Sequence, residues 1–498
     1  MTLIWETARR LRQKVVRREV SAAEVVRAFL ERQEAVEPKV RAFLHRVPEE
    51  TLLEEARALD RRLAQGEEPG PLWGVPVALK DNMAVEGMPM TAASRILEGY
   101  HPPYDATVVK KLREAGALLV GKTNLDEWAM GSSTETSAFG PTANPWDRQR
   151  VPGGSSGGAA AAVAAGEVPL SLGTDTGGSI RQPASFCGVV GLKATYGYVS
   201  RYGVASLASS LDHVGPLART VEDAALLYYV IRGRDSLDGQ TWGAPEAPGH
   251  IPEPLESLKG WRLGLPKEAF AHPALDPQVK ETVLAAVDLL ASLGAEVEEC
   301  SLPTFGLSVE AYQVLMAMEA ASNLARYDGI RYGRRMAGRT VQELYEKTRG
   351  EGLGTEVKRR ILLGTYLAQA PQYPLLWERA DKVRRLLRKE MEDLFHRYHL
   401  LITPTSPTVA FPFGALEENP DLRAYADIYT IPANLTGVPA LSLPCGFEPH
   451  LPVGLQLLAP WGQEEKLFQV ARTYEEEARW PLKPPLGEGT GLGGKLEP

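Results

Sequence analysis

Two loops rich in glycine and serine hold the residues that could perform acyl transfer. They are Pro152-Gly-Gly-Ser-Ser-Gly-Gly158 and Gly173-Thr-Asp-Thr-Gly-Gly-Ser-Ile-Arg-Gln-Pro183. Acyl transfer needs a nucleophile, a base and N–H donors that face the developing oxyanion. The glycines before Ser179 free the backbone to present such donors, which Thr176, Gly177, Gly178 and Ser179 could supply. The pattern favours a serine-based acyl-transfer site over two ordinary Gly/Ser loops.

Lys80 is a candidate for the base of such a site. It ends an apolar run over residues 72–80 that predicts a short buried strand. A lysine acts as a base only when its amine is neutral, so burial must lower its pKa from about 10.4 toward neutrality. Taken alone, a lysine at a strand end is more simply interpreted as a solvated surface charge.

A further segment, residues 116–123, matches the Walker A phosphate-binding pattern. That mechanism needs a strand before the first glycine and a loop between the two glycines. Here Ala-Leu-Leu-Val lies between Gly116 and Gly121 and predicts the strand itself, whereas Gly116 is typical of a helix C-terminus. The segment therefore predicts no nucleotide site.

Residues 153–157 also match the Gly-x-Ser-x-Gly nucleophile elbow of Ser-His-Asp hydrolases. That elbow follows an apolar strand, which residues 147–152 do not predict. Its triad also needs a histidine, and only His213 lies in a Ser/Gly context, so this alternative stays open as a minor one. His396 and His399 are three residues apart with no evident third ligand, so no metal site is predicted.

Composition narrows the class of protein. The chain has 498 residues, 44% of them hydrophobic, and a formal net charge of -8, which argues against a globally basic nucleic-acid-binding surface. Its three cysteines are too few and too scattered for a disulfide framework or a cysteine metal site. Basic residues interrupt the N-terminal apolar stretches, and residues 158–170 are too short to span a bilayer. We expect a cytoplasmic protein with no membrane segment.

Helix and strand patterns alternate along the chain. Ser21 and Glu24 form a capping box before an amphipathic helix. A predicted helix over 106–115 precedes a strand over 117–120, and a helix that Gly294 ends precedes a strand over 296–302. This alternation favours an α/β fold with a mixed or mostly parallel sheet.

Other segments complete the expected organisation. Residues 150–216 consist mostly of small residues that suit a backbone close to a ligand rather than bulky core packing. The remaining predictions are a surface connection over 235–260, a basic helical region over 310–400, two strands over 438–458 and a helix over 464–479. We expect one domain over 1–486 and a disordered tail over 487–498.

The two serine loops, together with Val77-Ala-Leu-Lys-Asp-Asn82, resemble the amidase-signature family. The resemblance implies a large, mostly parallel mixed sheet covered by helices on both faces. It also implies a catalytic trio in which Lys80 is the base, Ser155 rather than Ser156 is the proton bridge, and Ser179 is the nucleophile. The backbone of 176–179 becomes the oxyanion hole.

A closer resemblance extends over residues 5–486, to the A subunits of glutamyl-tRNA(Gln) amidotransferases. It rests on the segments 121–127, 130–135, 321–332, 356–361 and 432–437. The resemblance implies a glutaminase whose ammonia converts Glu-tRNA(Gln) to Gln-tRNA(Gln), in complex with B-type and C-type subunits. It implies no cofactor or metal in this chain, with ATP and Mg on the partner subunit.

The same resemblance implies a pocket for free glutamine. Arg360 would bind the α-carboxylate, Asp427 the α-ammonium, and Tyr312 would add a polar contact. The basic run around Arg360 could equally be a solvated face, and the choice of Arg360 over Arg359 rests on motif alignment. The chain departs from the family at residues 367–374, which bears on the pocket or the partner fit, and at Ala194.

Two other functions remain open. One is a stand-alone amidase that acts on small aliphatic or aromatic amides. The segment 310–365 is expected to distinguish an amidotransferase subunit from such an amidase. The other is a non-catalytic scaffold subunit. The presence of Lys80, Ser155 and Ser179 together argues against that second alternative.

Overall fold

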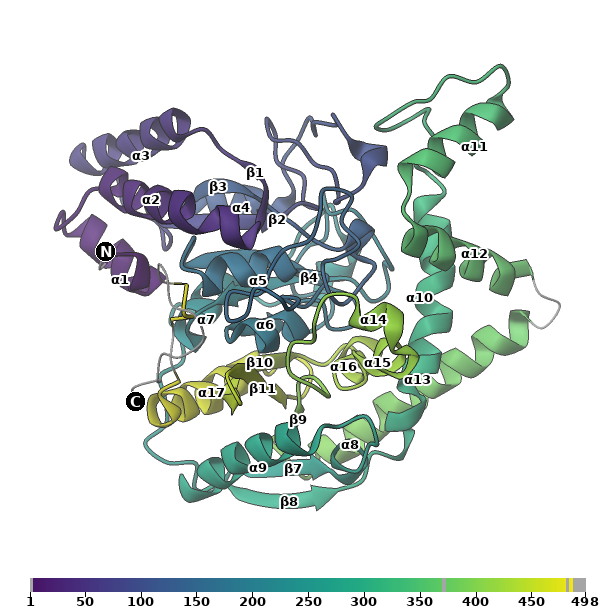
Figure 1. Cartoon of the computed structure of the whole chain (residues 1–498). Helices are drawn as coiled ribbons and strands as arrows, with labels where there is room; N and C mark the ends of the chain where they lie inside the picture. Colours follow the sequence, from purple (N-terminus) through teal and green to yellow (C-terminus); the bar gives the residue numbers. More distant parts are fainter. Residues whose placement is uncertain (1–2, 370–372, 481–482, 487–498) are drawn as a thin grey trace.

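One mixed sheet organises the computed structural model, which describes residues 3–369, 373–480 and 483–486 (Figure 1). Its eleven strands lie in the order β1-β3-β2-β4-β6-β5-β10-β11-β9-β7-β8. The strands are β1 (Phe43–Arg46), β2 (Pro76–Lys80), β3 (Leu118–Thr123), β4 (Leu170–Asp175), β5 (Val190–Lys193), β6 (His213–Ala218), β7 (Arg262–Pro266), β8 (Glu296–Cys300), β9 (Leu400–Pro404), β10 (Ala440–Glu448) and β11 (Leu451–Leu458).

The expected α/β class with a large mixed sheet is confirmed, although antiparallel pairs of neighbouring strands outnumber the parallel pairs by six to four. β2 is parallel to β3 and β4, and β7 is parallel to β8 and β9. The other neighbouring strands are antiparallel, including the run from β4 through β6, β5, β10 and β11 to β9. Parallel pairing therefore predominates only toward the two ends of the sheet, and β2 and β4 bring Lys80 and the second serine loop to the same edge.

Both faces of the sheet are buried. Successive side chains of a strand point to opposite faces, and in β2 Val77 and Leu79 belong to one hydrophobic cluster while Ala78 belongs to the other. In β3 Leu119 and Leu118 divide between the two clusters in the same way. This two-sided core explains why the strand that leads to Lys80 is apolar at consecutive positions.

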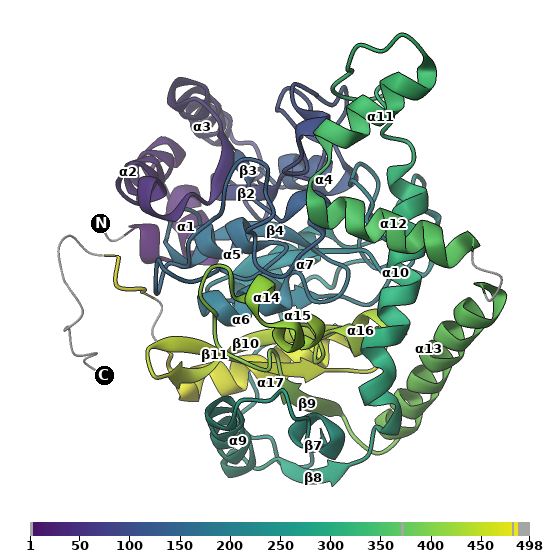
Figure 2. The same cartoon turned by 45° about the vertical axis from the view of Figure 1, so that its right-hand side comes forward.

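The helices cover the two faces of the sheet and one end of the molecule. They are α1 (Ala8–Val16), α2 (Ala22–Val40), α3 (Glu49–Ala64), α4 (Thr107–Glu114), α5 (Gly157–Ala164), α6 (Arg181–Cys187), α7 (Val221–Ile231), α8 (Lys267–Phe270), α9 (Pro277–Ser292), α10 (Ser308–Leu324), α11 (Val341–Gly352), α12 (Thr355–Gln369), α13 (Tyr373–Phe395), α14 (Ala415–Glu418), α15 (Pro420–Tyr425), α16 (Ile431–Thr436) and α17 (Glu464–Ala478). Helices α10 to α13 lie together on the side of the molecule opposite α1 to α3 (Figure 2). They form the predicted helical region 310–400.

The small-residue stretch has a packing role that the sequence did not predict. Every residue of α5 is buried, and its alanines belong to the hydrophobic cluster on one face of the sheet. A Cβ at Gly158 would lie 2.5 Å from the carbonyl oxygen of Ala42 and 2.6 Å from the Asn124 nitrogen. Small side chains thus let α5 approach neighbouring backbone closely, and the helix holds the first serine loop rigidly.

Local signals in the sequence place several elements correctly. Ser21 forms the predicted capping box with Glu24, an arrangement worth about 1 kcal/mol of helix stability. Gly116 and Gly294 lie just beyond helices with φ of 80° and 106°. The expected strand over 72–80 begins only at Pro76, because residues 71–74 form a turn.

Two further predictions concern the C-terminal tail and membrane segments. The predicted tail over 487–498 lies outside the described residues, as do 370–372 within the segment that departs from the family. Within the described residues, no helix is both long and apolar enough to cross a membrane.

Candidate active site

Lys80 lies at the end of β2 with its ammonium nitrogen surrounded by hydroxyl groups. Nζ is 2.7 Å from Oγ of Ser155, 2.8 Å from Oγ of Ser156 and 2.9 Å from Oγ1 of Thr174. The side chain is fully buried. The sequence predicted the contact with Ser155. It did not predict Ser156 or Thr174 as neighbours of Lys80, although both lie within the two serine loops.

This environment suits a lysine that acts as a base. Burial lowers the pKa of Lys80 from 10.5 to about 7, and the more distant Asp126, Asp175 and Asp212 limit the decrease. A lysine with a pKa near 7 is about half neutral at pH 7, and the neutral amine can accept a proton. The solvated-charge interpretation of Lys80 is therefore wrong, because the side chain has no exposed surface.

Ser155 and Ser179 lie on adjacent loops. The peptide bond between Gly154 and Ser155 is cis, and the Ser156 N–H donates to the Ser179 carbonyl oxygen at 3.1 Å. Ser179 is 8% exposed, whereas Ser155 and Lys80 have no exposed surface. Ser179 is thus the member of the predicted trio that a substrate can reach. Among the described hydrogen bonds, none joins the Ser155 and Ser179 hydroxyls directly.

The backbone from Thr176 to Ser179 carries the N–H groups predicted to form the oxyanion hole. In the described part of the chain, no N–H of these four residues donates to another protein group. Gly178 has a φ of 140°, in the region that favours glycine, and a Cβ there would lie 2.1 Å from Oγ1 of Thr430. That hydroxyl donates to the Gly177 carbonyl oxygen at 2.6 Å and so orients the peptide groups of the loop.

A buried ion pair holds the nucleophile loop against the end of β4. Arg181 and Asp175 have no exposed surface, and the guanidinium donates to both carboxylate oxygens, at 3.0 and 3.1 Å. The same carboxylate accepts the Ile180 N–H and the Asn434 amide. Burial alone would raise the pKa of Asp175, but Arg181 holds it well below its usual range. No pattern in the sequence predicted this pair, although Arg181 lies only two residues after Ser179, the predicted nucleophile.

The three residues predicted to bind glutamine come from α10, α12 and the segment before α16. A Cβ at Gly177 would lie 2.7 Å from the Tyr312 hydroxyl, so Tyr312 borders the predicted oxyanion hole. Burial raises the pKa of Tyr312, and the charges of Arg360 and Asp427 both act on it. Tyr312 therefore lies beside the second serine loop, and Arg360 and Asp427 lie near enough for their charges to act on it.

Arg360 and Arg359 differ in their exposure. The Arg360 side chain is 15% exposed and donates from Nε to Glu356 at 2.7 Å. The Arg359 side chain is 52% exposed and pairs with the same glutamate. The basic run is thus not uniformly solvated, and Arg360 is the arginine that faces the interior.

Asp427 has one carboxylate oxygen bound and one free. Oδ2 accepts the Ser132 hydroxyl at 2.6 Å, whereas Oδ1 is buried and accepts no hydrogen bond from the described residues. Burial raises the pKa of Asp427 to about 6, and Ser132 and Arg360 oppose the increase. A buried, unpaired carboxylate oxygen suits a cationic ligand group.

The structure also shows that neither the Walker A match nor the Ser-His-Asp match forms the site that its motif requires. β3 runs through Gly121, Lys122 and Thr123, so the Walker-like segment has no phosphate loop. His213 is buried on β6, where it contacts the Leu211 carbonyl oxygen at 2.6 Å and Nζ of Lys193 at 3.3 Å. Lys80 rather than a histidine contacts Ser155, which removes the support for a Ser-His-Asp triad.

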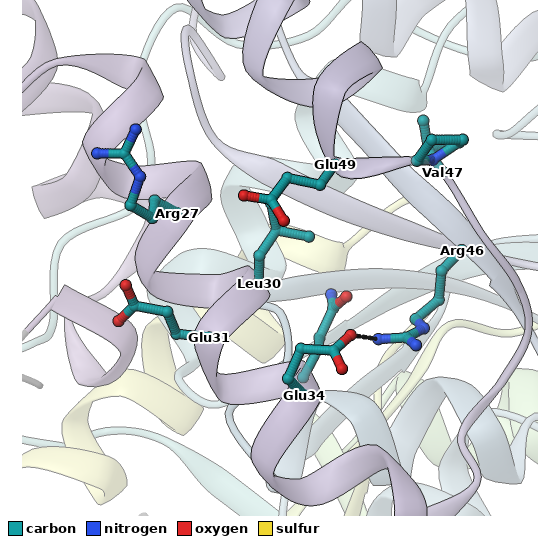
Figure 3. A pocket seen from close by; sticks show the side chains of 9 residues that line it. Arg27, Leu30, Glu31, Glu34, Arg46, Val47 and Glu49 are labelled. Atoms are coloured by element: carbon teal, nitrogen blue, oxygen red, sulfur yellow. Dashed lines mark hydrogen bonds and ion pairs between the residues drawn. The ribbon is translucent and has the colours of Figure 1, made fainter.

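The described part of the chain has no metal-binding cluster, and one hollow lies away from this site. Within the described residues, no group of three or more His, Cys, Asp or Glu side chains could hold a metal ion. A hollow of about 340 Å³ lies between α2 and residues 46–49, and Glu34 and Arg46 in its lining form an ion pair (Figure 3). Its lining carries both signs of charge and none of the predicted site residues.

Comparison with known proteins agrees with the geometry. The Amidase family model matches residues 24–468. The A subunits of glutamyl-tRNA(Gln) amidotransferase from Carboxydothermus hydrogenoformans and Symbiobacterium thermophilum are 52% and 53% identical to this chain. The alignments cover 96% and 94% of this chain, and 99% and 96% of the relatives.

Solved structures show the same fold. The crystal structure of the glutamyl-tRNA(Gln) amidotransferase A subunit from Thermotoga maritima superposes with a TM-score of 0.79 at 40% identity and covers 99% of both chains. The peptide amidase of Stenotrophomonas maltophilia superposes with a TM-score of 0.82 at 31% identity, over 98% of this chain and 99% of that one. The chain therefore belongs to the amidase family and, within it, to the A subunits of glutamyl-tRNA(Gln) amidotransferases.

Proposed function

We propose that this chain hydrolyses glutamine with Ser179 as nucleophile, Ser155 as proton bridge and Lys80 as base. The observation that carries the proposal is the fully buried Lys80, which lies 2.7 Å from the Ser155 hydroxyl and has a pKa near 7. The reaction fits the names of the relatives, which are subunits of an enzyme that amidates a tRNA-bound glutamate.

The acylation step moves one proton along the trio. Neutral Lys80 accepts the Ser155 proton as Ser155 accepts that of Ser179, and Oγ of Ser179 forms a bond to the side-chain amide carbon. The N–H groups of 176–179 bind the oxyanion, a type of contact worth about 3–4 kcal/mol per donor. Ser155 then donates its proton to the leaving nitrogen and regains one from Lys80, the C–N bond breaks and ammonia departs.

Deacylation uses the same groups. Water attacks the ester that links the glutamyl group to Ser179, and its proton passes through Ser155 to Lys80. Collapse of the second tetrahedral intermediate releases glutamate, and Oγ of Ser179 regains its proton.

We propose further that Arg360, Asp427 and Tyr312 bind the free amino acid. Arg360 is charged and mostly buried, which suits the α-carboxylate. Oδ1 of Asp427 is buried without a partner among the described residues, which suits the α-ammonium. The Tyr312 hydroxyl lies against Gly177 of the proposed oxyanion hole, which suits a further contact with the substrate.

The remaining reaction belongs to an assembly. We assign B-type and C-type partner subunits, with Glu-tRNA(Gln), ATP and Mg bound by the partner, and we place the complex in the cytoplasm. The names of the relatives as A subunits and the free cysteines Cys187, Cys300 and Cys445 support this assignment. We propose that residues 1–486 act as one catalytic unit.

The proposal is tested by ammonia release from glutamine, asparagine and simple aliphatic amides, for the chain alone and with its partner subunits. A preference for glutamine that increases with partners and Glu-tRNA is expected, and Ser179→Ala should abolish turnover. Arg360→Lys should lower kcat/KM for glutamine roughly 10- to 100-fold. The matched Arg359→Lys should not, because Arg359 is exposed. Faster hydrolysis of simple amides, indifferent to partners, would indicate a stand-alone amidase.

A further inference from the structure

Asp126 is a fully buried carboxylate that lies just beyond β3 and holds a loop over residues 131–136. Its Oδ2 accepts the Ser133 N–H at 3.2 Å. Its Oδ1 accepts the Thr136 hydroxyl at 2.9 Å and the Thr136 N–H at 3.4 Å. The carboxylate thus fixes the two ends of one turn of this loop, which we call the 131–136 loop.

The same carboxylate lies directly against the first serine loop. A Cβ at Gly154 would lie 2.1 Å from Oδ2 of Asp126, and a Cβ at Gly131 would lie 2.3 Å from its Cγ. Distances this short leave no room for a side chain at either glycine. The Asp126 N–H also donates to the Ser155 carbonyl oxygen at 3.3 Å. Asp126 is therefore enclosed between the 131–136 loop and the peptide that carries the proton bridge.

Further hydrogen bonds join these two loops. The Thr134 hydroxyl donates to the Gly153 carbonyl oxygen at 2.7 Å. The Gln182 amide bridges them, because it donates to the Ser132 carbonyl oxygen and accepts the Gly154 N–H, both at 2.9 Å. The 131–136 loop also carries the Ser132 hydroxyl that binds Asp427. One loop therefore contacts both the catalytic serine loop and the predicted ammonium ligand.

We propose that Asp126 is a positioning residue that holds the 131–136 loop against residues 153–155 and so places both Ser155 and Ser132. Through Ser155 it sets the path of the proton, and through Ser132 it sets the carboxylate that receives the substrate ammonium. The inference rests on the proposed function for the role of Ser132 and Asp427. The role toward Ser155 applies to any amide substrate.

Asp126 has an electrostatic effect that a purely structural residue would lack. Among the acidic groups that raise the pKa of Lys80, Asp126 has the largest effect, ahead of Asp175 and Asp212. Asp175 is itself paired with Arg181. Burial raises the pKa of Asp126, and the N–H and hydroxyl donors from 133–136 oppose that increase. Glu135 is the further carboxyl of this loop on which the Asp126 charge acts.

The test is the kinetics of Asp126→Asn in the full chain with its partner subunits. Misplacement of the loops is expected to lower kcat/KM for glutamine by about 100-fold, with an increase in KM and a decrease in kcat. Because the lost negative charge favoured protonated Lys80, the acidic limb of the pH profile should move to lower pH. Asp223→Asn is the matched control, since Asp223 is a buried aspartate that accepts the Ala8 and Arg9 N–H groups. It should leave the acidic limb unchanged.

Thr134→Val separates position from charge. It removes the hydrogen bond to Gly153 but keeps the carboxylate, so kcat should fall while the acidic limb stays in place.

If Asp126→Asn does not fold, Thr136→Val removes a single donor to the carboxylate and should lower kcat/KM several-fold. Wild-type kinetics in the Asp126 variant, or in the Thr136 variant where that one carries the test, would overturn the proposal. A shift of the acidic limb with simple amides but no glutamine preference would refute the proposed function and retain the role of Asp126.

Discussion

Two lysines at the ends of neighbouring strands differ in what surrounds them. Lys80 ends β2, Lys122 lies near the end of β3, and neither has any exposed side-chain surface. Nζ of Lys122 lies 2.8 Å from a carboxylate oxygen of Asp81. Nζ of Lys80 contacts hydroxyl groups and one carbonyl oxygen, with no carboxylate of the described residues in hydrogen-bond contact.

The difference explains how the fold gives Lys80 the environment that the proposed base needs. Burial disfavours the charged form, and a carboxylate in contact restores it. At Lys80 the contact carboxylate is missing from the described environment, and hydroxyl groups that can relay a proton take its place. At Lys122 the ion pair joins β3 to the segment after β2. Burial alone therefore does not make a catalytic lysine, and the identity of its neighbours decides.

Replacement of Lys80, the proposed base, should have the largest effect on turnover. Lys80→Met is expected to lower kcat by about 10²–10⁴-fold, the range of general acid–base catalysis, measured as ammonia release from glutamine. The variant should also be at least as stable as the wild type, because folding depresses the pKa of Lys80 from 10.5 to about 7.

The stability part of that prediction depends on pH. Between pH 7 and 10.5 the unfolded chain binds more protons than the folded chain, so wild-type stability rises with pH across this window. The stability advantage of Lys80→Met should be greatest at pH 7 and shrink toward pH 10.5 in denaturant unfolding. A variant that melts well below the wild type at pH 7 would contradict this account of Lys80.

Replacement of the paired lysine should act on folding instead. Lys122→Met leaves Asp81 buried without its cation, which is expected to lower the free energy of unfolding by about 3–5 kcal/mol. The exposed Lys110→Met serves as the control and should change it by less than about 0.5 kcal/mol. If Lys122→Met were as stable as the wild type and inactive, the contrast between the two lysines would be wrong.

The smallest effect is expected at Ser156. Its hydroxyl donates to the Thr174 carbonyl oxygen at 3.0 Å and accepts from Nζ of Lys80. Ser156→Ala removes an acceptor that favours the charged lysine, so the acidic limb of kcat/KM should move to lower pH. Turnover should stay within roughly tenfold of the wild type. Ser155→Ala should be far slower, and equal losses in the two variants would mean that either serine can bridge the proton.

The sequence reveals the members of the proposed catalytic centre better than it reveals the contacts that support them. Lys80, Ser155 and Ser179 lie in contiguous motifs whose glycines and serines show their chemistry directly. Asp126, Ser132 and Thr430 contact these loops or the proposed pocket from segments distant in sequence, which no local pattern reveals. Strand order has the same limit, because β10 pairs with β5, which lies far earlier in the chain. The buried α5 was missed because small residues suit close packing as well as they suit a ligand loop.

The central claim is that a neutral Lys80 starts the reaction through Ser155. The most direct test is the pH dependence of kcat/KM for glutamine in the wild-type complex, compared with Ser156→Ala. The account predicts an acidic limb with its midpoint near pH 7 that moves to lower pH in the variant. An acidic limb that does not move in the variant, or a rate independent of pH between about 5 and 8, would contradict it.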